Sequence, residues 1–134
     1  FQQFARYITH RSAESLSATE TCTLDPADPI VVLITAPSAA EARTLADLLV
    51  EENLAACVQI LPSMESVYRW KGQVESAAEV LLLVKTLETH FQELEERVRA
   101  VHSYETPEIV AIPVTAISSP YLEWLAESLD SRPD

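Results

Sequence analysis

A single glycine constrains this chain more than any other feature of its sequence. Gly72 is the one position at which a positive φ angle carries no steric cost. Lys71-Gly72 separates two segments, 56–70 and 74–86, that are typical of strands, so we expect a tight hairpin turn there. Fifteen extended residues span about 50 Å, whereas a domain of this size measures about 30–40 Å across. The hairpin is therefore expected to project beyond its own core, where another copy of the chain would cover it.

The composition predicts one globular domain and disfavours two classes of partner. The chain has 134 residues, of which 48% are apolar, enough for a hydrophobic core. No uninterrupted apolar run approaches the roughly 18 residues of a transmembrane helix. The net charge of −12 argues against nucleic acid and against membrane surfaces, which need basic residues on the protein. An acidic surface is compatible with cations as partners, although it also serves solubility alone.

Residues 1–29 are interpreted as an extension and residues 30–134 as the folded domain. The extension ends in a cluster of turn-forming residues at 25–29. Its start contains Arg6 and Arg11 and no acidic residue, which is typical of a transit-peptide remnant, although a mis-assigned start gives the same pattern.

Cysteine usage indicates a reducing compartment. Cys22 and Cys57 do not form a disulfide framework, and neither belongs to a Cys-x-x-Cys motif. The expected location is the cytoplasm, or an organelle matrix if the start of the chain is a transit-peptide remnant.

The hydrophobic patterns predict the element order β-α-β-β-α-β-α. The run at 30–34 is continuous and largely β-branched, so its strand is expected to be buried on both faces. The first six elements form the ferredoxin-like split β-α-β unit, an α+β fold with sheet order 4-1-3-2 and an extra C-terminal helix. Beyond the hairpin, a strand is expected at 107–114 and helices at 38–53, 89–103 and from 119 onward.

Local signals mark several boundaries. Ser38 with Glu41, and Thr89 with Gln92, match the capping-box pattern at the starts of the first two helices. Pro62 interrupts the first hairpin strand, which predicts an edge position or a bulge at that point.

Several activities of this fold lack their sequence signals. An RNA-recognition module needs exposed aromatic residues on the strands at 30–35 and 80–84, which are aliphatic. A soft-metal chaperone needs Cys-x-x-Cys after the first strand, and an acylphosphatase-like enzyme needs Arg and a phosphate-binding loop there. The loop has none of these, and no nucleophile–base pair is apparent from spacing. We therefore predict a protein that is not an enzyme.

Polar residues at strand and helix ends are candidates for binding. Lys85 closes the apolar run at 80–84 and either extends to solvent at the sheet edge or pairs with an anion. His102 is either a cap of a helix C-terminus or a metal ligand, with Glu105 and Glu108 as nearby oxygen donors.

Three further residues have competing interpretations. Cys57 lies in a strand of small residues, and this setting favours its interpretation as a buried and inert thiol. Tyr68 and Trp70 near the hairpin tip either pack at a subunit contact or bind a ligand. The alternative of a small-molecule site assumes that these two aromatics and Lys85 cluster near one end of the hairpin.

At this point the chain resembles the CutA family of divalent-cation-tolerance proteins from about Ile30 to Leu129. Six segments stand in the order and spacing of that family. They are Thr35-Ala36-Pro37, Leu54-Ala55-Ala56-Cys57-Val58, Ser66-Val67-Tyr68-Arg69-Trp70-Lys71-Gly72, Glu79-Val80 with Leu83-Val84-Lys85-Thr86, His102-Ser103-Tyr104-Glu105-Thr106-Pro107-Glu108-Ile109, and Tyr121-Leu122-Glu123-Trp124-Leu125.

The resemblance implies a homotrimer that binds divalent metal, copper above all, in clefts between subunits and takes part in the response to metal ions. An animal member is linked to anchoring of acetylcholinesterase, and the trimer resembles the PII signalling proteins. The alternative is therefore a PII-like module that binds a small molecule or a protein partner. No cofactor is obligatory, and copper or another divalent cation is the expected ligand.

The inter-subunit cleft of the family maps onto a defined set of residues. His102 is the metal ligand that the resemblance favours. Ile34 replaces a cysteine found in some bacterial members, Ser103 replaces a proline, and Ala116-Ile117 replaces a His-Gly pair, which weakens a copper site. The cleft residues are Cys57, Tyr68, Trp70, Lys85, His102, Tyr104, Glu108 and Trp124.

Overall fold

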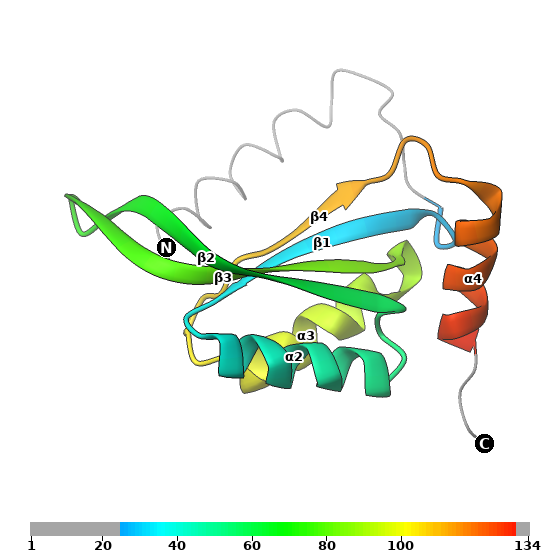
Figure 1. The fold of residues 1–134 in the computed structure, drawn as a ribbon, viewed down its shortest axis with the longest axis horizontal. Helices are drawn as coiled ribbons and strands as arrows, with labels where there is room; N and C mark the ends of the chain where they lie inside the picture. The colour runs from blue at the N-terminus through cyan, green and yellow to red at the C-terminus, as the bar shows by residue number, and fades with distance from the viewer. Residues whose placement is uncertain (1–24, 131–134) are drawn as a thin grey trace.

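The computed structural model describes residues 25–130, which form one antiparallel sheet with the helices at 39–51 and 91–101 against one of its faces and the helix at 119–130 at one end of the sheet (Figure 1). The sheet order is β2-β3-β1-β4, which is the predicted order read from the opposite edge. The elements are β1 (Pro29–Ala36), α2 (Ala39–Glu51), β2 (Cys57–Trp70), β3 (Gln73–Leu87), the 3₁₀ turn η1 (Glu88–His90), α3 (Phe91–Val101), β4 (Ile109–Pro113) and α4 (Ser119–Asp130). The predicted α+β class and strand order are confirmed.

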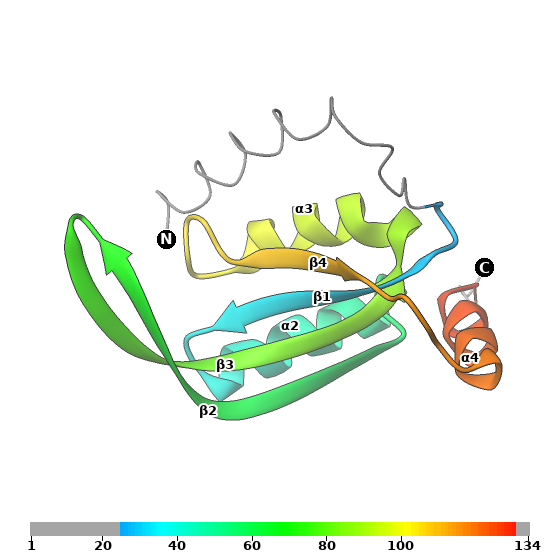
Figure 2. The ribbon, with the colours of Figure 1, turned by 90° about the horizontal axis from the view of Figure 1, so that it is seen from above.

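The hairpin of β2 and β3 extends past the rest of the sheet, as the lengths of its strands predict. Its strands pair as far as Trp70 opposite Gln73, whereas β1 accompanies β3 only up to Ala36 opposite Val80. Residues 64–79, called here the projecting hairpin, therefore lie beyond the ends of α2 and α3 (Figures 1 and 2). Lys71 and Gly72 have φ angles of 50° and 79°, as a tight turn with two left-handed residues requires.

Pro62 has both consequences that the sequence predicts. The pairing of β2 with β3 shifts between Leu61 and Met64, and Ser63 has a φ angle of 63°. β2 is also an edge strand, where a residue without an N–H interrupts no ladder on its outer side. The bulge marks the point at which the hairpin leaves the body of the sheet.

The core lies between one face of the sheet and the helices α2 and α3. Its residues alternate along the central strands and recur at helical spacing, as packing against a sheet demands. They include Ile30, Val32, Ile34, Leu82, Val84, Leu45, Leu49, Leu94 and Val98, all at most 1% exposed.

The expectation that the first strand is buried on both faces is wrong for the single chain. Val31 and Leu33 point away from the helices and are only half-buried. No described helix covers that face of the sheet, so its apolar residues remain in contact with solvent. We call the set the open sheet face; it comprises Val31, Leu33, Leu61, Leu81, Leu83, Val110 and Ile112.

The capping prediction holds for one helix and fails for the other. Ser38 accepts a hydrogen bond from the N–H of Glu41 at 3.2 Å at the start of α2. Thr89 caps nothing, because η1 precedes α3, which begins only at Phe91. The backbone N–H of Thr89 donates instead to the carbonyl of Pro26 at 2.9 Å, in the turn that the sequence predicts before β1. A tertiary hydrogen bond has replaced the expected local cap.

Candidate cation-binding cleft

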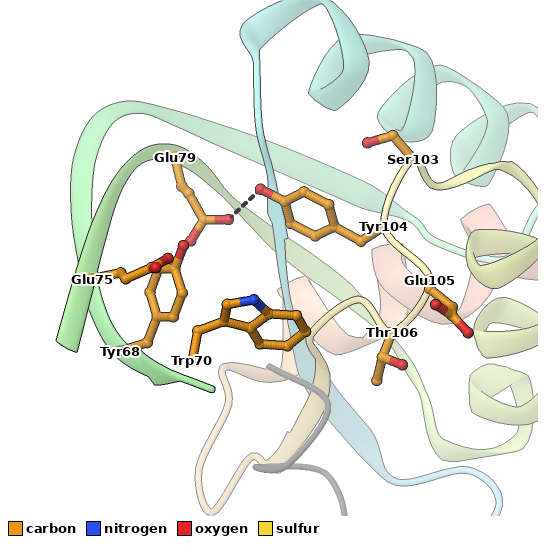
Figure 3. Close-up of a pocket in the computed structure, with 8 residues that line it drawn as sticks. All are labelled: Tyr68, Trp70, Glu75, Glu79, Ser103, Tyr104, Glu105 and Thr106. Atoms are coloured by element: carbon orange, nitrogen blue, oxygen red, sulfur yellow. Dashed lines mark hydrogen bonds between the residues drawn. The ribbon is translucent and has the colours of Figure 1, made fainter. Parts of the chain in front are cut away.

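A cleft of about 400 Å³ opens between the projecting hairpin and the connection from α3 to β4 (Figure 3). The two-residue turn determines which hairpin residues line the cleft, because its register places Tyr68 directly opposite Glu75. Strand alternation then brings Trp70 and Glu79 to the same side of the ribbon as this pair. The lining residues are Tyr68, Trp70, Glu75, Glu79, Ser103, Tyr104, Glu105 and Thr106.

Glu79 is the most enclosed acidic residue of the cleft. Its side chain belongs to a residue only 3% exposed, and its Oε2 accepts a hydrogen bond from the hydroxyl of Tyr104 at 3.0 Å (Figure 3). Burial, this hydrogen bond and the carboxylate charge together raise the pKa of Tyr104 to about 12. Tyr104 therefore stays protonated and donates to Glu79 at any physiological pH.

Two buried side-chain oxygens near Tyr104 have no hydrogen-bond partner in the described part of the chain. They are Oε1 of Glu79 and Oγ1 of Thr35. Thr35 pairs with Leu81, two residues from Glu79, so both polar side chains belong to the same face of adjacent strands. An unpaired buried oxygen costs about 1–3 kcal/mol, and more when it carries charge. This end of the sheet therefore holds acceptor capacity that the described residues do not use.

Glu108 adds to the negative potential beside the cleft. Burial raises the pKa of this carboxyl group, and the charge of Glu79 raises it further. Its coupling to Glu79 places Glu108 near the cleft, as the sequence predicts for an oxygen donor, although Glu108 does not line it.

His102 is tied to the backbone at both ring nitrogens. Its Nε2 lies 2.8 Å from the carbonyl oxygen of Thr35, and its Nδ1 lies 3.0 Å from the N–H of Tyr104. A carbonyl only accepts and an N–H only donates, so the proton is on Nε2 and the ring is neutral. The contact of Nδ1 with Glu41 at 3.4 Å is then not an ion pair. His102 therefore joins the end of α3 to β1, and metal binding would require it to release one backbone partner.

The predicted cleft residues fall into two groups within one chain. Tyr68, Trp70 and Tyr104 meet in the cleft, with Glu108 beside it. The second group lies at the opposite end of the sheet, so a site that includes all of them needs more than one subunit.

The second group surrounds the start of β2. Cys57 pairs directly with Lys85, whose ammonium group donates to the side-chain oxygen of Gln59. On α4, Trp124 contacts Tyr121 with ring centroids 5.5 Å apart. Burial and the thiol of Cys57 raise the pKa of Tyr121, which links α4 to this end of β2. The expectation that Lys85 clusters with the aromatics of the hairpin tip is therefore wrong within one chain, because the length of the hairpin separates them.

Four lining residues were not among the predicted site residues: the acidic Glu75 and Glu79, and the small polar Ser103 and Thr106. Glu75 was within reach, since counting back from Gly72 across a two-residue turn places it opposite Tyr68. Glu79 was within reach as well, because the same register continues from the turn to Met64 opposite Glu79. Only its burial beneath Tyr104 depends on the connection between α3 and β4.

Residues 25–130 contain no group of three or more His, Cys, Asp or Glu side chains that could hold a metal ion within one chain. The same part of the chain contains no helix long and apolar enough to cross a membrane.

The fold and the cleft together define a ferredoxin-like α+β protein with an acidic, aromatic cleft at the base of an extended hairpin. Residues 30–128 match the family model described as CutA1 divalent ion tolerance protein. The chain belongs to this family.

Relatives and solved structures agree with this assignment. The "Divalent-cation tolerance protein CutA" of Thermus thermophilus is 55% identical over 98 residues, which cover 73% of this chain and 95% of that protein. The "Protein CutA, chloroplastic" of Arabidopsis thaliana is 48% identical over 99 residues, 74% of this chain and 54% of the plant protein. The crystal structure of CutA1 from Oryza sativa superimposes with a TM-score of 0.75 at 43% identity, covering 78% of this chain and 96% of that one.

Proposed function

We propose that this chain forms a homotrimer that binds divalent metal ions in clefts at its subunit boundaries and thereby contributes to the tolerance of such ions. The proposal assigns binding, and not catalysis, to the cleft. Its relatives in Thermus thermophilus and Pectobacterium atrosepticum are named for divalent-cation tolerance. We place the protein in the cytoplasm or, like the plant relatives named chloroplastic, in an organelle.

The observation that carries the proposal is the charge of the cleft. Glu75, Glu79 and Glu105 line it, and none of its described lining residues is basic. Carboxylate oxygens bind hard divalent cations, and a concave acidic surface concentrates cations of any kind. Because one chain alone lacks a group of three such ligands among residues 25–130, the proposal adds ligands from a neighbouring subunit.

Assembly is supported by the open sheet face. Leu61, Val110 and Ile112 are 42%, 42% and 44% exposed, next to half-buried leucines on β1 and β3. The projecting hairpin adds Val67 and Val74, at 66% and 65% exposed. An apolar surface of this extent favours contact with another protein surface, and the continuous face suits a second copy of the same sheet.

Copper(II) is the metal to test first, because imidazole is a good copper ligand and His102 lies beside the cleft. Calorimetric titration of the full chain with copper(II) and zinc(II) should give binding that weakens in the double variant Glu75→Gln/Glu105→Gln. Glu65→Gln, an exposed change on the same hairpin, should leave binding unchanged. Equal binding in all three proteins would contradict a metal site in this cleft.

The role of His102 is tested separately. His102→Ala should abolish the preference for copper over zinc if the ring exchanges the N–H of Tyr104 for the metal. Identical binding of both metals to this variant and to the wild type, with the fold intact by circular dichroism, would remove His102 from the site.

A second function is favoured by the size of the cleft. At about 400 Å³ it exceeds what a single metal ion fills and lies in the range of small-molecule pockets. The second candidate is therefore a PII-like trimeric module in which a small molecule or a partner protein occupies the cleft.

A further inference from the structure

We propose that the cleft binds a small linear organic amine, whose primary ammonium group donates to Oε1 of Glu79 while its hydrocarbon chain lies along the rings of Tyr68 and Trp70. This ligand class goes beyond metal ions. The proposal rests on the proposed function only in assigning a cation to the cleft.

The unpaired oxygen of Glu79 defines what the ligand must donate. Its partner oxygen is already occupied by Tyr104 at 3.0 Å, and among the described residues no cationic side chain forms an ion pair with Glu79. A charged N–H donor forms a hydrogen bond to a carboxylate that is roughly twice as strong as a neutral donor's. A primary ammonium supplies such donors at the end of a thin chain, which suits an enclosed oxygen.

Aromatic rings form the wall next to this carboxylate. Figure 3 shows Tyr68, Trp70 and Tyr104 around the same space as Glu79. The ring of Trp70 already attracts a cation, since Nζ of Lys71 lies 5.8 Å from its centroid. Rings of this kind bind the methylene groups next to an ammonium as well as the charge itself.

Two further carboxylates suit a ligand with more than one charge. Glu75 comes from β3 and Glu105 from the connection between α3 and β4, so they lie on opposite walls of the cleft (Figure 3). A second ammonium at the far end of a short alkyl chain would meet one of them, while the first remains with Glu79. Burial is the main cause of the raised pKa of Glu108, and the charge of Glu79 adds to it, so Glu108 contributes a further carboxyl group beside Glu79.

Calorimetric titration with 1,4-diaminobutane and spermidine, at fixed ionic strength and with the full chain, tests the proposal. We expect one site per chain, and we expect Glu79→Gln to weaken binding about tenfold or more, because the amide keeps the shape and loses the charge. Trp70→Leu, a change at a half-exposed position, should weaken binding without altering the fold. Choline, which has no N–H group, should bind about tenfold more weakly than the diamine.

Glu65→Gln is the matched control, since it makes the same charge change at an exposed residue of β2 outside the cleft. Equal weakening in Glu65→Gln and Glu79→Gln would reduce the binding to general attraction by an acidic surface and overturn the proposal. Choline binding as tightly as the diamine would overturn it as well. The metal titrations on the same samples separate the two proposals. If the protein binds the amine but no metal, only the proposed metal site is contradicted. If it binds metal but no amine, only the amine site is contradicted.

Discussion

At the scale of single residues, the main feature of the cleft and its surroundings is a set of buried side-chain oxygens. Glu79, Glu108 and Thr35 each carry an oxygen that is buried unpaired or carries charge in a partly dry environment. Such groups reduce the stability of the free chain, and structures retain them mainly where binding or chemistry uses them. Two substitutions measure this cost directly.

Thr35→Val should raise the free energy of unfolding by about 1 kcal/mol, because it removes a buried hydroxyl that has no described partner. Thr86→Val is its matched control on the neighbouring strand. Thr86 is also fully buried, but its hydroxyl donates to the carbonyl of Leu54 at 2.7 Å, so this change should destabilise by about 1 kcal/mol. Urea unfolding of both variants gives the comparison. Similar losses in the two would mean that Thr35 has a partner after all.

Glu108→Gln should raise the melting temperature at pH 7. The pKa of Glu108 in the folded chain is raised above its ordinary value of 4.5, so its contribution to stability is complete below pH 4.5 and is lost as the pH rises through the folded value. The amide resembles the protonated acid, so the advantage of the variant should disappear below about pH 4.5.

Glu96→Gln controls for the change in net charge, since Glu96 is exposed on α3. An equal rise in both variants across the whole pH range would show that the cause is the overall charge of the protein and not the environment of Glu108.

At the scale of elements, the hairpin turn decides where the cleft can form. Lys71 and Gly72 both have left-handed backbone, which glycine adopts without strain and lysine does not. The turn fixes the register that pairs Tyr68 with Glu75, and the bulge at Pro62 then resets it before the body of the sheet. A change at the turn therefore acts on both the stability of the hairpin and the shape of the cleft.

Gly72→Ala should destabilise the protein by about 1 kcal/mol through backbone strain alone, since an added Cβ would meet no atom within 4 Å. Lys71→Asn should stabilise it by up to about 1 kcal/mol, because asparagine tolerates the left-handed region and Asn-Gly is the preferred pair for this turn. Thermal unfolding of the two variants tests the pair. Two shifts of the same sign would contradict the assigned turn.

At the scale of the whole molecule, the described helices cover one side of the sheet and not the other. The helices bury Ile30, Val32 and Ile34 completely, while Val31 and Leu33, between them in sequence, are left half-exposed on the open sheet face. The projecting hairpin, which lies beyond the core (Figure 2), also exposes apolar side chains. Both features favour assembly of several copies.

Leu83→Glu, in the middle of the open sheet face, should lower the sedimentation mass of the protein from that of the proposed trimer toward that of one chain. A charge at this position would have to be buried in the contact, which costs several kcal/mol when it is unpaired. Val50→Glu is the control, since Val50 is 42% exposed on α2, away from the open sheet face. An unchanged mass for Leu83→Glu, or a wild type that sediments as one chain, would contradict assembly through this face.

Much of this architecture could be predicted because it rests on local signals. The hydrophobic periods located the strands and helices, Gly72 located the turn, and Pro62 located the bulge. The failures have one cause. Thr89 does not cap α3, and its backbone N–H donates to the carbonyl of Pro26 instead. Lys85 lies at the opposite end of the hairpin from Tyr68. Both depend on contacts between segments distant in sequence, which no local pattern records.

The sequence alone determined the family, the order of the strands and a hairpin longer than its core, because residue type and spacing fix backbone preference and strand alternation. Only the tertiary structure decided which side chains meet. It brought Glu79 under the hydroxyl of Tyr104, engaged both ring nitrogens of His102 in hydrogen bonds with the backbone, and placed none of the described helices over one face of the sheet. The physical reason is that burial and pairing of a polar group depend on everything packed around it, and most of those neighbours lie far away along the chain.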